Sequence, residues 1–224
     1  MDGGGELLHD FIAALDGDPA NIVIRYPPDR PMNYTELKTF VCAHLPKNGP
    51  YVLLAESFSG PIAISIAASG PPGLAGLILS SSFARNPRRA LSVLRPFLSI
   101  IPLKLVPTRL LGLFALGRFA TPIHRQKLSK ALAAVSLSAL RTRARSVLDA
   151  DVTPILRHVS VPVLYLRATK DRIVPSDCGE TIVRATPRAR VVEIEAPHFL
   201  LQVAPKQAAA AIKEFIAALP SFAS

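Results

Sequence analysis

Three residues of this sequence have the types and the chain order of an activated serine and its helpers. Ser57, Asp171 and His198 each follow shortly after an apolar run. A serine hydroxyl is a weak nucleophile until an imidazole removes its proton, and a carboxylate orients that imidazole and stabilises its charged form. The set therefore points to nucleophilic attack by Ser57, with His198 as general base and Asp171 as the orienting acid.

The surroundings of Ser57 suit a nucleophile better than an ordinary turn serine. The stretch L-L-A-E-S-F-S-G-P runs from an apolar strand directly into a helix start. Such a fast turn strains the backbone, but it lifts the hydroxyl above the sheet and leaves the N–H of Phe58 available to an oxyanion. The small side chains of Ala55 and Ser59 would let strand and helix approach closely. Taken alone, Ser57 could still be structural.

Other titratable residues compete for these roles. Asp177 follows Pro175 and is expected to cap a helix, while Asp149 and Asp151 precede a strand rather than follow one. Glu56, beside the nucleophile, could shape a pocket or join a polar network. The remaining histidines are expected on helices or at the surface: His9, His44, His124 and His158.

The elements that must position these residues alternate along the chain. Continuous apolar runs predict strands, and 3.6-residue periodicity predicts helices between them. This alternation indicates an α/β fold with a mostly parallel sheet flanked by helices, and ligands then bind at the carboxyl ends of the strands. The predicted strands are Asn21–Tyr26, Tyr51–Ala55, Leu74–Leu79, Val163–Arg167 and Arg190–Ile194, and the helices Tyr34–Leu45, Gly60–Ser69 and Lys206–Leu219.

The middle of the chain breaks this rhythm. Helical stretches are predicted at Arg88–Leu98, Thr108–Phe119 and Lys127–Val147, with no convincing strand between them. A helical cap or lid inserted into the core is the simplest reading. We therefore expect a core of residues 1–82 and 149–224, interrupted by a cap of residues 83–148.

Charge is distributed unevenly between these parts. The formal net charge is +10, yet no Asp or Glu occurs between Glu56 and Asp149, and the segment Arg85–Arg145 holds 13 of the 26 basic residues. The rest of the chain carries 13 bases and all 16 acids, a net of −3. A solvated helical face is one interpretation. A lid that attracts an anionic substrate, a carrier protein or a lipid surface is another. Nucleic acid is disfavoured because no binding motif or aromatic stacking pattern accompanies the charge.

The sequence also bears on location and redox state. The start M-D-G-G-G-E lacks a basic end and an apolar run, which predicts a cytoplasmic protein. The apolar region Pro96–Ile123 is broken by prolines, glycines and charges, so a transmembrane segment is not expected. Cys42 and Cys178 fit no metal or redox spacing and are expected to be buried, reduced thiols.

Three motifs together resemble the α/β-hydrolase family. A-E-S-F-S-G resembles its nucleophile elbow, T-K-D-R-I-V-P its acid-bearing segment and A-P-H-F-L its histidine segment, although the usual flanking glycines are Ala55 and Ser59. The resemblance implies a serine hydrolase that cleaves a small-molecule carboxylic ester or thioester, with no metal or organic cofactor. An acyltransferase with the same three residues, or a non-catalytic domain, stays open. Apolar cap positions suggest a hydrophobic acyl group, but they would equally suit the core of the cap itself: Phe97, Leu98, Ile100, Ile101, Leu110, Leu111 and Phe114.

The N-terminus resembles one further part of this family. M-D-G-G-G-E-L-L-H-D-F is similar to the loop, written roughly P-G-L-D-G-T-G in one branch, that donates the second oxyanion N–H. The match puts Met1 at the donor position. The strand that precedes this loop in the family has no counterpart here, so we expect a hydrolase fold truncated at its N-terminus.

Overall fold

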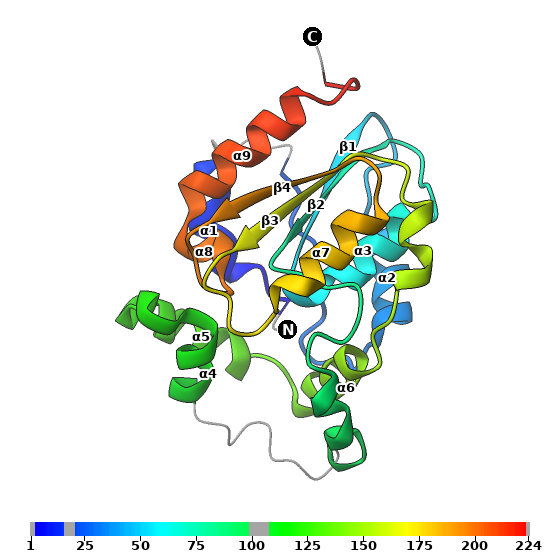
Figure 1. Cartoon of the computed structure of the whole chain (residues 1–224). Coiled ribbons are helices and arrows are strands. Elements are labelled where there is room, and N and C mark those ends of the chain that lie inside the picture. The colour runs from blue at the N-terminus through cyan, green and yellow to red at the C-terminus, as the bar shows by residue number, and fades with distance from the viewer. Residues whose placement is uncertain (1–2, 16–20, 99–107, 223–224) are drawn as a thin grey trace.

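The computed structural model describes residues 3–15, 21–98 and 108–222. Its centre is a four-stranded, fully parallel sheet with the order β1-β2-β3-β4. The strands are β1 (Tyr51–Glu56), β2 (Leu74–Ser80), β3 (Val163–Ala168) and β4 (Ala189–Ile194). The prediction of an α/β fold with a parallel sheet is confirmed (Figure 1).

The strands form here because apolar side chains occupy both faces of the sheet. Leu77 and Val163 face one buried cluster, whereas Ile78 and Leu164 face another on the opposite side. Strands buried on both faces read as continuous apolar runs. The register places Glu56 opposite Ser80, so β1 and β2 end at the same level.

Helices cover both faces of this sheet (Figure 1). On one face, α1 (His9–Ala14), α8 (Leu200–Val203) and α9 (Pro205–Ala217) pack in the cluster around Phe11 and Phe215. On the other face lie α3 (Gly60–Ala67), α7 (Ser176–Ala185) and the 3-10 helix η6 (Thr153–His158). Helix α2 (Tyr34–Cys42) begins at a capping box between Asn33 and Glu36 and packs against α3.

The predicted strand Asn21–Tyr26 is wrong. Its residues belong to no strand, and β1 has β2 as its only strand neighbour among the described residues. The Tyr26 N–H instead donates to the carbonyl oxygen of Gly3, and the Tyr26 side chain packs in a cluster with Phe58. A strand needs backbone hydrogen bonds to a neighbouring strand. The neighbour of residues 21–26 is the glycine-rich N-terminal loop, which supplies the bond between Gly3 and Tyr26.

Residues 83–148, here called the cap segment, contain helices and no strand among their described residues; Arg85 forms an isolated β-bridge with Asp151. The helices are η3 (Arg89–Phe97), α4 (Thr108–Leu116), η5 (Gly117–Phe119), α5 (Pro122–Ala133) and α6 (Leu137–Leu148). The predicted helix Lys127–Val147 is divided because Ser136 starts a new helix, its hydroxyl accepting from the N–H of Ala139. Arg88–Leu98 forms a 3-10 rather than an α-helix, with Pro96 inside it.

The cap segment lies over the carboxyl ends of the strands, below the sheet in the view of Figure 1. Arg88 donates to the carbonyl oxygens of Arg172 and Ile173, in the loop after β3. Arg118 forms an ion pair with Glu195, directly after β4. The segment therefore contacts the edge where an α/β sheet places its reactive groups.

Two other features differ from or extend the predictions. Both cysteines are free thiols, but Cys42 is exposed and only Cys178 is buried. Cys42 lies at the last turn of α2, away from its packed side, so its expected burial is wrong. Among the described helices, none has both the length and the apolar character needed to cross a bilayer.

Candidate active site

The structure brings Ser57, His198 and Asp171 into one hydrogen-bonded chain. Ser57 Oγ lies 2.7 Å from His198 Nε2, and His198 Nδ1 lies 2.8 Å from Asp171 Oδ2. The side chains of His198 and Asp171 are both only 6% exposed. Because 141 residues separate Ser57 from His198 along the chain, the fold alone makes this contact.

Ser57 occupies a strained turn directly after β1. Its φ is +50°, in the left-handed region that a residue with a side chain rarely adopts. The short 3-10 helix η2 (Ser57–Ser59) leads straight into α3, which has Pro61 in its first turn. The predicted sharp strand-to-helix turn is thus observed at Ser57.

Two small contacts below Ser57 hold this turn. Ser82, fully buried after β2, donates its hydroxyl proton to the carbonyl oxygen of Ser57 at 2.8 Å. Gly60 lies so close that a Cβ there would sit 1.7 Å from Ser82 Oγ. The sequence suggested that the small side chains of Ala55 and Ser59 allow the strand and the helix to approach each other. In the structure, Gly60 is a position in this turn at which a Cβ would clash. Ser82 was not singled out from the sequence, although it ends the run S-S-S that closes β2.

Asp171 is fixed by backbone donors from its own loop. Its Oδ1 accepts hydrogen bonds from the N–H groups of Ile173 and Val174, at 2.8 and 2.9 Å. This arrangement reserves Oδ2 for His198. The carboxylate is therefore held in one orientation, with one oxygen for the loop and the other for the imidazole.

The competing acids lie elsewhere. Asp149 pairs with Arg95, and Asp151 accepts from Thr153. Asp177 was expected to cap α7, but that helix has no side-chain cap and Asp177 faces Arg85 instead, at 3.7 Å.

Glu56 connects the turn at Ser57 to the histidine loop. Its Oε2 accepts from Gln202 Nε2 at 2.9 Å, and its Oε1 accepts from the N–H of Leu201 at 3.4 Å. Both donors lie in α8, which begins two residues after His198. The sequence left the role of Glu56 open, and the structure shows that it joins a polar network.

The N-terminal glycine loop approaches the same turn through Tyr26. The carbonyl oxygen of Gly3 accepts from the Tyr26 N–H at 2.9 Å, and the Tyr26 hydroxyl donates to Ser59 Oγ at 2.9 Å. Burial raises the pKa of Tyr26, so its phenol keeps the proton that it donates. Met1, the expected second oxyanion donor, lies outside the described residues, whereas Phe58 is buried directly after Ser57.

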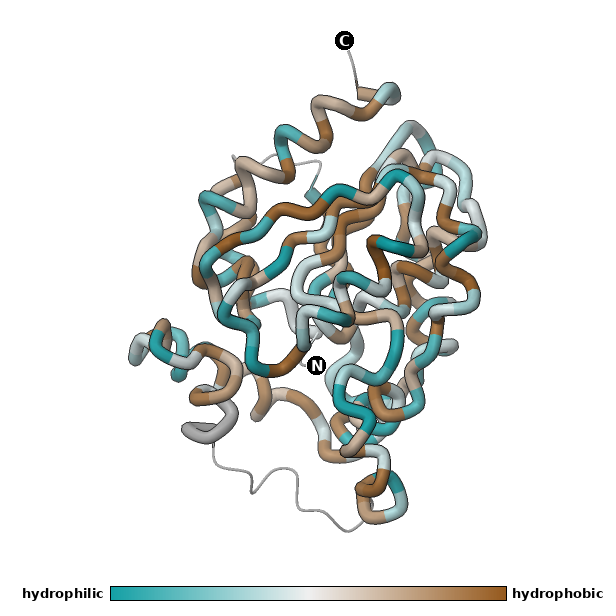
Figure 2. Tube along the Cα trace, viewed as in Figure 1, coloured by the Kyte–Doolittle hydropathy of each residue, from teal (hydrophilic) through white to brown (hydrophobic). Residues whose placement is uncertain are grey.

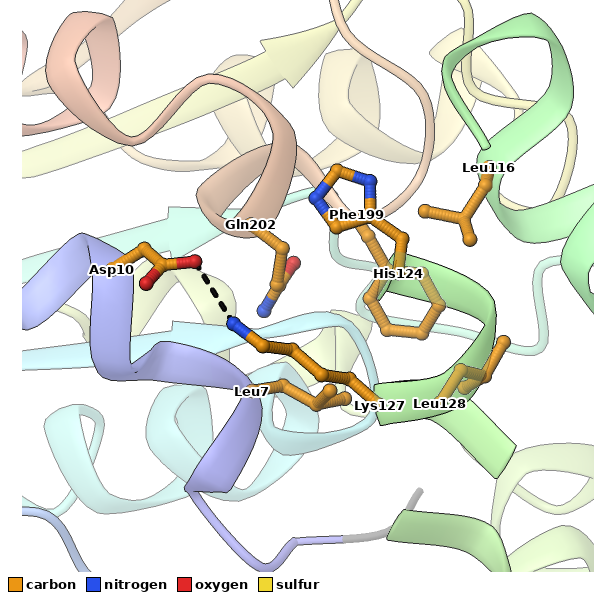
Figure 3. A pocket seen from close by; sticks show the side chains of 8 residues that line it. All are labelled: Leu7, Asp10, Leu116, His124, Lys127, Leu128, Phe199 and Gln202. Carbon is orange, nitrogen blue, oxygen red and sulfur yellow. Dashed lines mark hydrogen bonds and ion pairs between the residues drawn. The ribbon is translucent and has the colours of Figure 1, made fainter. Parts of the chain in front are cut away.

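Two cavities flank the histidine and the acid. One, of ≈ 20 Å³, lies between α1, the cap segment and α8, and Figure 3 shows its lining. Leu7, Leu116, Leu128 and Phe199 make it largely apolar, and the ion pair between Asp10 and Lys127 crosses its side. The second cavity, of ≈ 320 Å³, is polar and lies against Asp171, lined also by Ser81, Arg167 and Glu193.

The described residues offer no cluster of three or more His, Cys, Asp or Glu side chains that could hold a metal ion. Hydrogen bonds join the serine, the imidazole and the carboxylate at this site.

Comparison with known proteins places this geometry in a family. The model of the family described as serine aminopeptidase, S33 (Hydrolase_4) matches residues 32–199, which is most of the chain and includes all three of these residues. The chain belongs to the α/β-hydrolases. No match to a curated protein was found.

Solved structures agree with this hydrolase fold. A bromoperoxidase from Bacillus anthracis superposes with a TM-score of 0.79 at 16% identity, covering 95% of this chain and 87% of that one. An esterase from Exiguobacterium antarcticum gives 0.77 at 14% identity, with coverages of 92% and 86%. The enol-lactonase from Burkholderia xenovorans LB400 gives 0.74 at 16%, with 84% and 74%. At such identities, the likeness concerns the fold of the α/β-hydrolase and not its substrate.

Proposed function

We propose that this α/β-hydrolase cleaves carboxylic esters or thioesters of small molecules through an acyl-enzyme on Ser57. The observation that carries the proposal is the chain of hydrogen bonds from Ser57 Oγ through His198 to Asp171. Attack by the serine, general-base catalysis by the histidine and orientation by the acid each require these distances.

The reaction would proceed in two acyl-transfer steps. Ser57 Oγ attacks the acyl carbon while His198 Nε2 takes its proton, and the resulting imidazolium is stabilised by Asp171. The imidazolium then protonates the leaving alcohol or thiol, which departs and leaves the acyl group on Ser57. Water, activated by the same imidazole, attacks this ester and releases the acid.

The negative charge that forms on the acyl oxygen needs backbone donors. The N–H of Phe58 follows the nucleophile in the strained turn and is one proposed donor; the other would come from the N-terminal loop at Met1. In support of the second, Gly3 contacts Tyr26, which in turn contacts Ser59 beside the nucleophile.

The cap segment is proposed as the cover of this site, inserted between core parts 1–82 and 149–224. Leu116 and Leu128 of the cap line a cavity together with Phe199, the neighbour of His198. The cavity itself has room for only about one water molecule. Its apolar side chains, with the Phe199 ring centroid 5.8 Å from that of His198, favour a hydrophobic acyl or alcohol group in the substrate. Esterase and lactonase among the structural neighbours are compatible with this class.

Labelling with a fluorophosphonate probe tests the proposal. Covalent labelling of the purified protein should map to Ser57 and should be lost in Ser57→Ala and in His198→Ala. Ser65→Ala, whose hydroxyl bonds to the backbone of its own helix, and His158→Ala serve as matched controls and should label normally. A folded protein without labelling would refute the assignment.

Products then identify the reaction. A series of p-nitrophenyl esters of increasing chain length measures the acyl preference. An added alcohol distinguishes water from an alcohol as the acyl acceptor, since an acyltransferase would form the new ester in place of the free acid.

A further inference from the structure

Exposed apolar side chains are concentrated in the cap segment. Nine large hydrophobic residues are exposed in the part of the chain that the structure describes, and seven of them lie between residues 91 and 123. They are Leu91, Val93, Leu94, Phe97, Leu113, Phe114 and Ile123. Scattered apolar residues are normal on a protein surface, whereas such a concentration marks an interaction site.

The 3-10 helix η3 is the clearest case. It buries none of its residues, although it carries four of these seven side chains, and Val93 is 68% exposed. Burial of an apolar face is what normally stabilises a short helix. Leu91, Leu94 and Phe97 are 39 to 50% exposed, so a large part of each of these apolar side chains is available to another phase or partner.

Basic residues accompany this apolar surface. Arg89 is exposed on η3, and Arg125 and Lys130 are exposed on α5. Arg88 and Arg95 are exposed as well, but Arg88 donates to two backbone carbonyl oxygens and Arg95 pairs with Asp149. No acid occurs between Glu56 and Asp149. Figure 1 shows η3 and the helices α4 and α5 at the lower end of the molecule, and Figure 2 shows apolar residues among hydrophilic ones in both parts.

We propose that the described helices of the cap segment dock on an anionic lipid surface, with η3 and the start of α5 inserted at the headgroup level. An interfacial helix combines exposed apolar side chains with Lys and Arg, which is the composition observed here. Basic residues gain from the negative potential of such a surface, while their aliphatic stems stay near the apolar boundary.

Charge decides against a second copy of the chain as the partner. A symmetric contact between two cap segments would bring two acid-free, strongly basic surfaces together, and like charges oppose such a contact. An acidic protein surface would satisfy the arginines but not the four exposed apolar side chains of η3. A lipid surface satisfies both, because phosphate lies directly above hydrocarbon.

Docking in this position would present the active site to the membrane. The cap segment contacts the loops that carry Asp171 and His198, through Arg88 and Arg118. A hydrophobic ester dissolved in the bilayer would then leave it close to the catalytic edge of the sheet. This consequence rests on the proposed function, but the docking itself does not.

Vesicle sedimentation tests the docking without any turnover. The intact protein is mixed with sucrose-loaded vesicles of phosphatidylcholine alone, or of phosphatidylcholine with phosphatidylglycerol. Binding is expected to the anionic vesicles only and should weaken as salt is added. Equal binding to both vesicle types, or binding to neither, would overturn the proposal.

Paired variants separate the apolar from the electrostatic contribution. Leu91→Ser with Val93→Ser should reduce the partition coefficient by at least about tenfold. The matched control is Ile22→Ser with Phe222→Ser, which removes two large exposed apolar side chains that the structure describes outside the cap. Equal losses in both pairs would refute a specific surface on η3.

The basic residues are tested in the same way. Arg125→Gln with Lys130→Gln should weaken binding and flatten its salt dependence. Arg188→Gln with Lys206→Gln should do neither, because these two residues are also exposed but lie outside the cap segment, in residues 149–224. Soluble poly-glutamate is the probe for an acidic protein. If it binds as tightly as the vesicles and does not respond to Leu91→Ser with Val93→Ser, the partner is a polyanion and the lipid proposal is wrong.

Hydrolysis of p-nitrophenyl acetate should be unchanged in all four double variants, since none of these residues contacts the site. Lipid binding by a Ser57→Ala protein would show that docking stands even if the proposed hydrolysis fails.

Discussion

The Ser82 hydroxyl donates a hydrogen bond of 2.8 Å to the carbonyl oxygen of Ser57. Ser82 is fixed in turn by Tyr165, because its carbonyl oxygen accepts a hydrogen bond from the Tyr165 hydroxyl at 2.7 Å. Burial raises the pKa of Tyr165, so this phenol remains a donor. The strained backbone of Ser57 is thus stabilised by two consecutive hydrogen bonds, from Tyr165 in β3 to Ser82 and from Ser82 to Ser57.

Gly60 packs so closely against Ser82 that this position tolerates no side chain. Gly60→Ala would place a Cβ 1.7 Å from Ser82 Oγ and 2.8 Å from Ser82 Cβ. We expect a loss of about 1 to 3 kcal/mol in the free energy of unfolding, measured by urea denaturation, together with slower fluorophosphonate labelling. Gly112→Ala, where the nearest atom would be 3.8 Å away, should cost nothing.

A second substitution checks the cause of that loss. Ser82→Gly removes the clashing side chain, so adding it to Gly60→Ala should recover part of the stability. If the double variant is as unstable as the sum of the two single ones, the clash is not the reason.

Asp171→Asn should inactivate the enzyme without unfolding it. The two N–H donors of Ile173 and Val174 would keep the amide oxygen of the asparagine, which turns its NH₂ towards His198. Nδ1 must then accept a hydrogen bond, so Nε2 carries the proton and cannot take one from Ser57. We expect kcat/KM to fall by about 10³- to 10⁴-fold.

The matched control for this change is Asp177→Asn, on the surface of α7. Its activity should equal that of the unmodified protein. If Asp177→Asn reduced kcat/KM as strongly, the assignment of the acid to Asp171 would be lost.

Glu56 should act as a positioning residue for the histidine loop. Glu56→Ala removes the acceptor of the Gln202 side chain and of the Leu201 N–H, and so breaks both hydrogen bonds. We expect kcat to fall by about tenfold with little change in KM, because a small misplacement of His198 costs rate rather than binding.

The reciprocal exchange tests this role. Glu56→Gln combined with Gln202→Glu restores a donor and an acceptor in the opposite direction, and should recover most of the kcat lost in Glu56→Ala. Glu180→Gln, which affects only a surface pair with Arg184, is the control. Failure of the double variant to recover would indicate that the charge of Glu56 matters and not its hydrogen bond.

The two cysteines should differ in reactivity. Burial, with Asp177 nearby, raises the pKa of the Cys178 thiol to about 11. Its thiolate fraction at pH 8 is then about one in a thousand, and the thiolate is the form that reacts. Iodoacetamide on the native protein should modify the exposed Cys42 alone, as read by mass spectrometry, and both cysteines after denaturation. Modification of Cys178 at the same rate would contradict its burial.

The sequence was most informative where structure is local. The strands β1 to β4 were predicted within about a residue because each is a continuous apolar run closed by polar or turn residues. Ser57, Asp171 and His198 could be grouped because parallel strands put their carboxyl ends at one edge, and the structure places all three there. The helix α3 likewise followed from Gly60 and Pro61.

Features that depend on distant partners were not predictable. Residues 21–26 have the composition of a strand, but only a pairing partner would make them one. The bond from Glu56 to Gln202 spans 146 residues, and no local pattern marks it. Cys42 was expected inside because cysteine is usually buried. It is exposed because it lies on the side of α2 that does not pack against the protein.

The acid-free composition of the cap segment has one more consequence, for engineering. In the described part of the cap, basic side chains form ion pairs with acids of the core: Arg85 with Asp177, Arg95 with Asp149, Arg118 with Glu195 and Lys127 with Asp10. The segment cannot neutralise its own charge, so it is not a portable module. Grafted onto another hydrolase, the cap segment would need carboxylates at the positions of the new host that match Asp177, Asp149, Glu195 and Asp10. The cap and these core carboxylates would have to be transferred together.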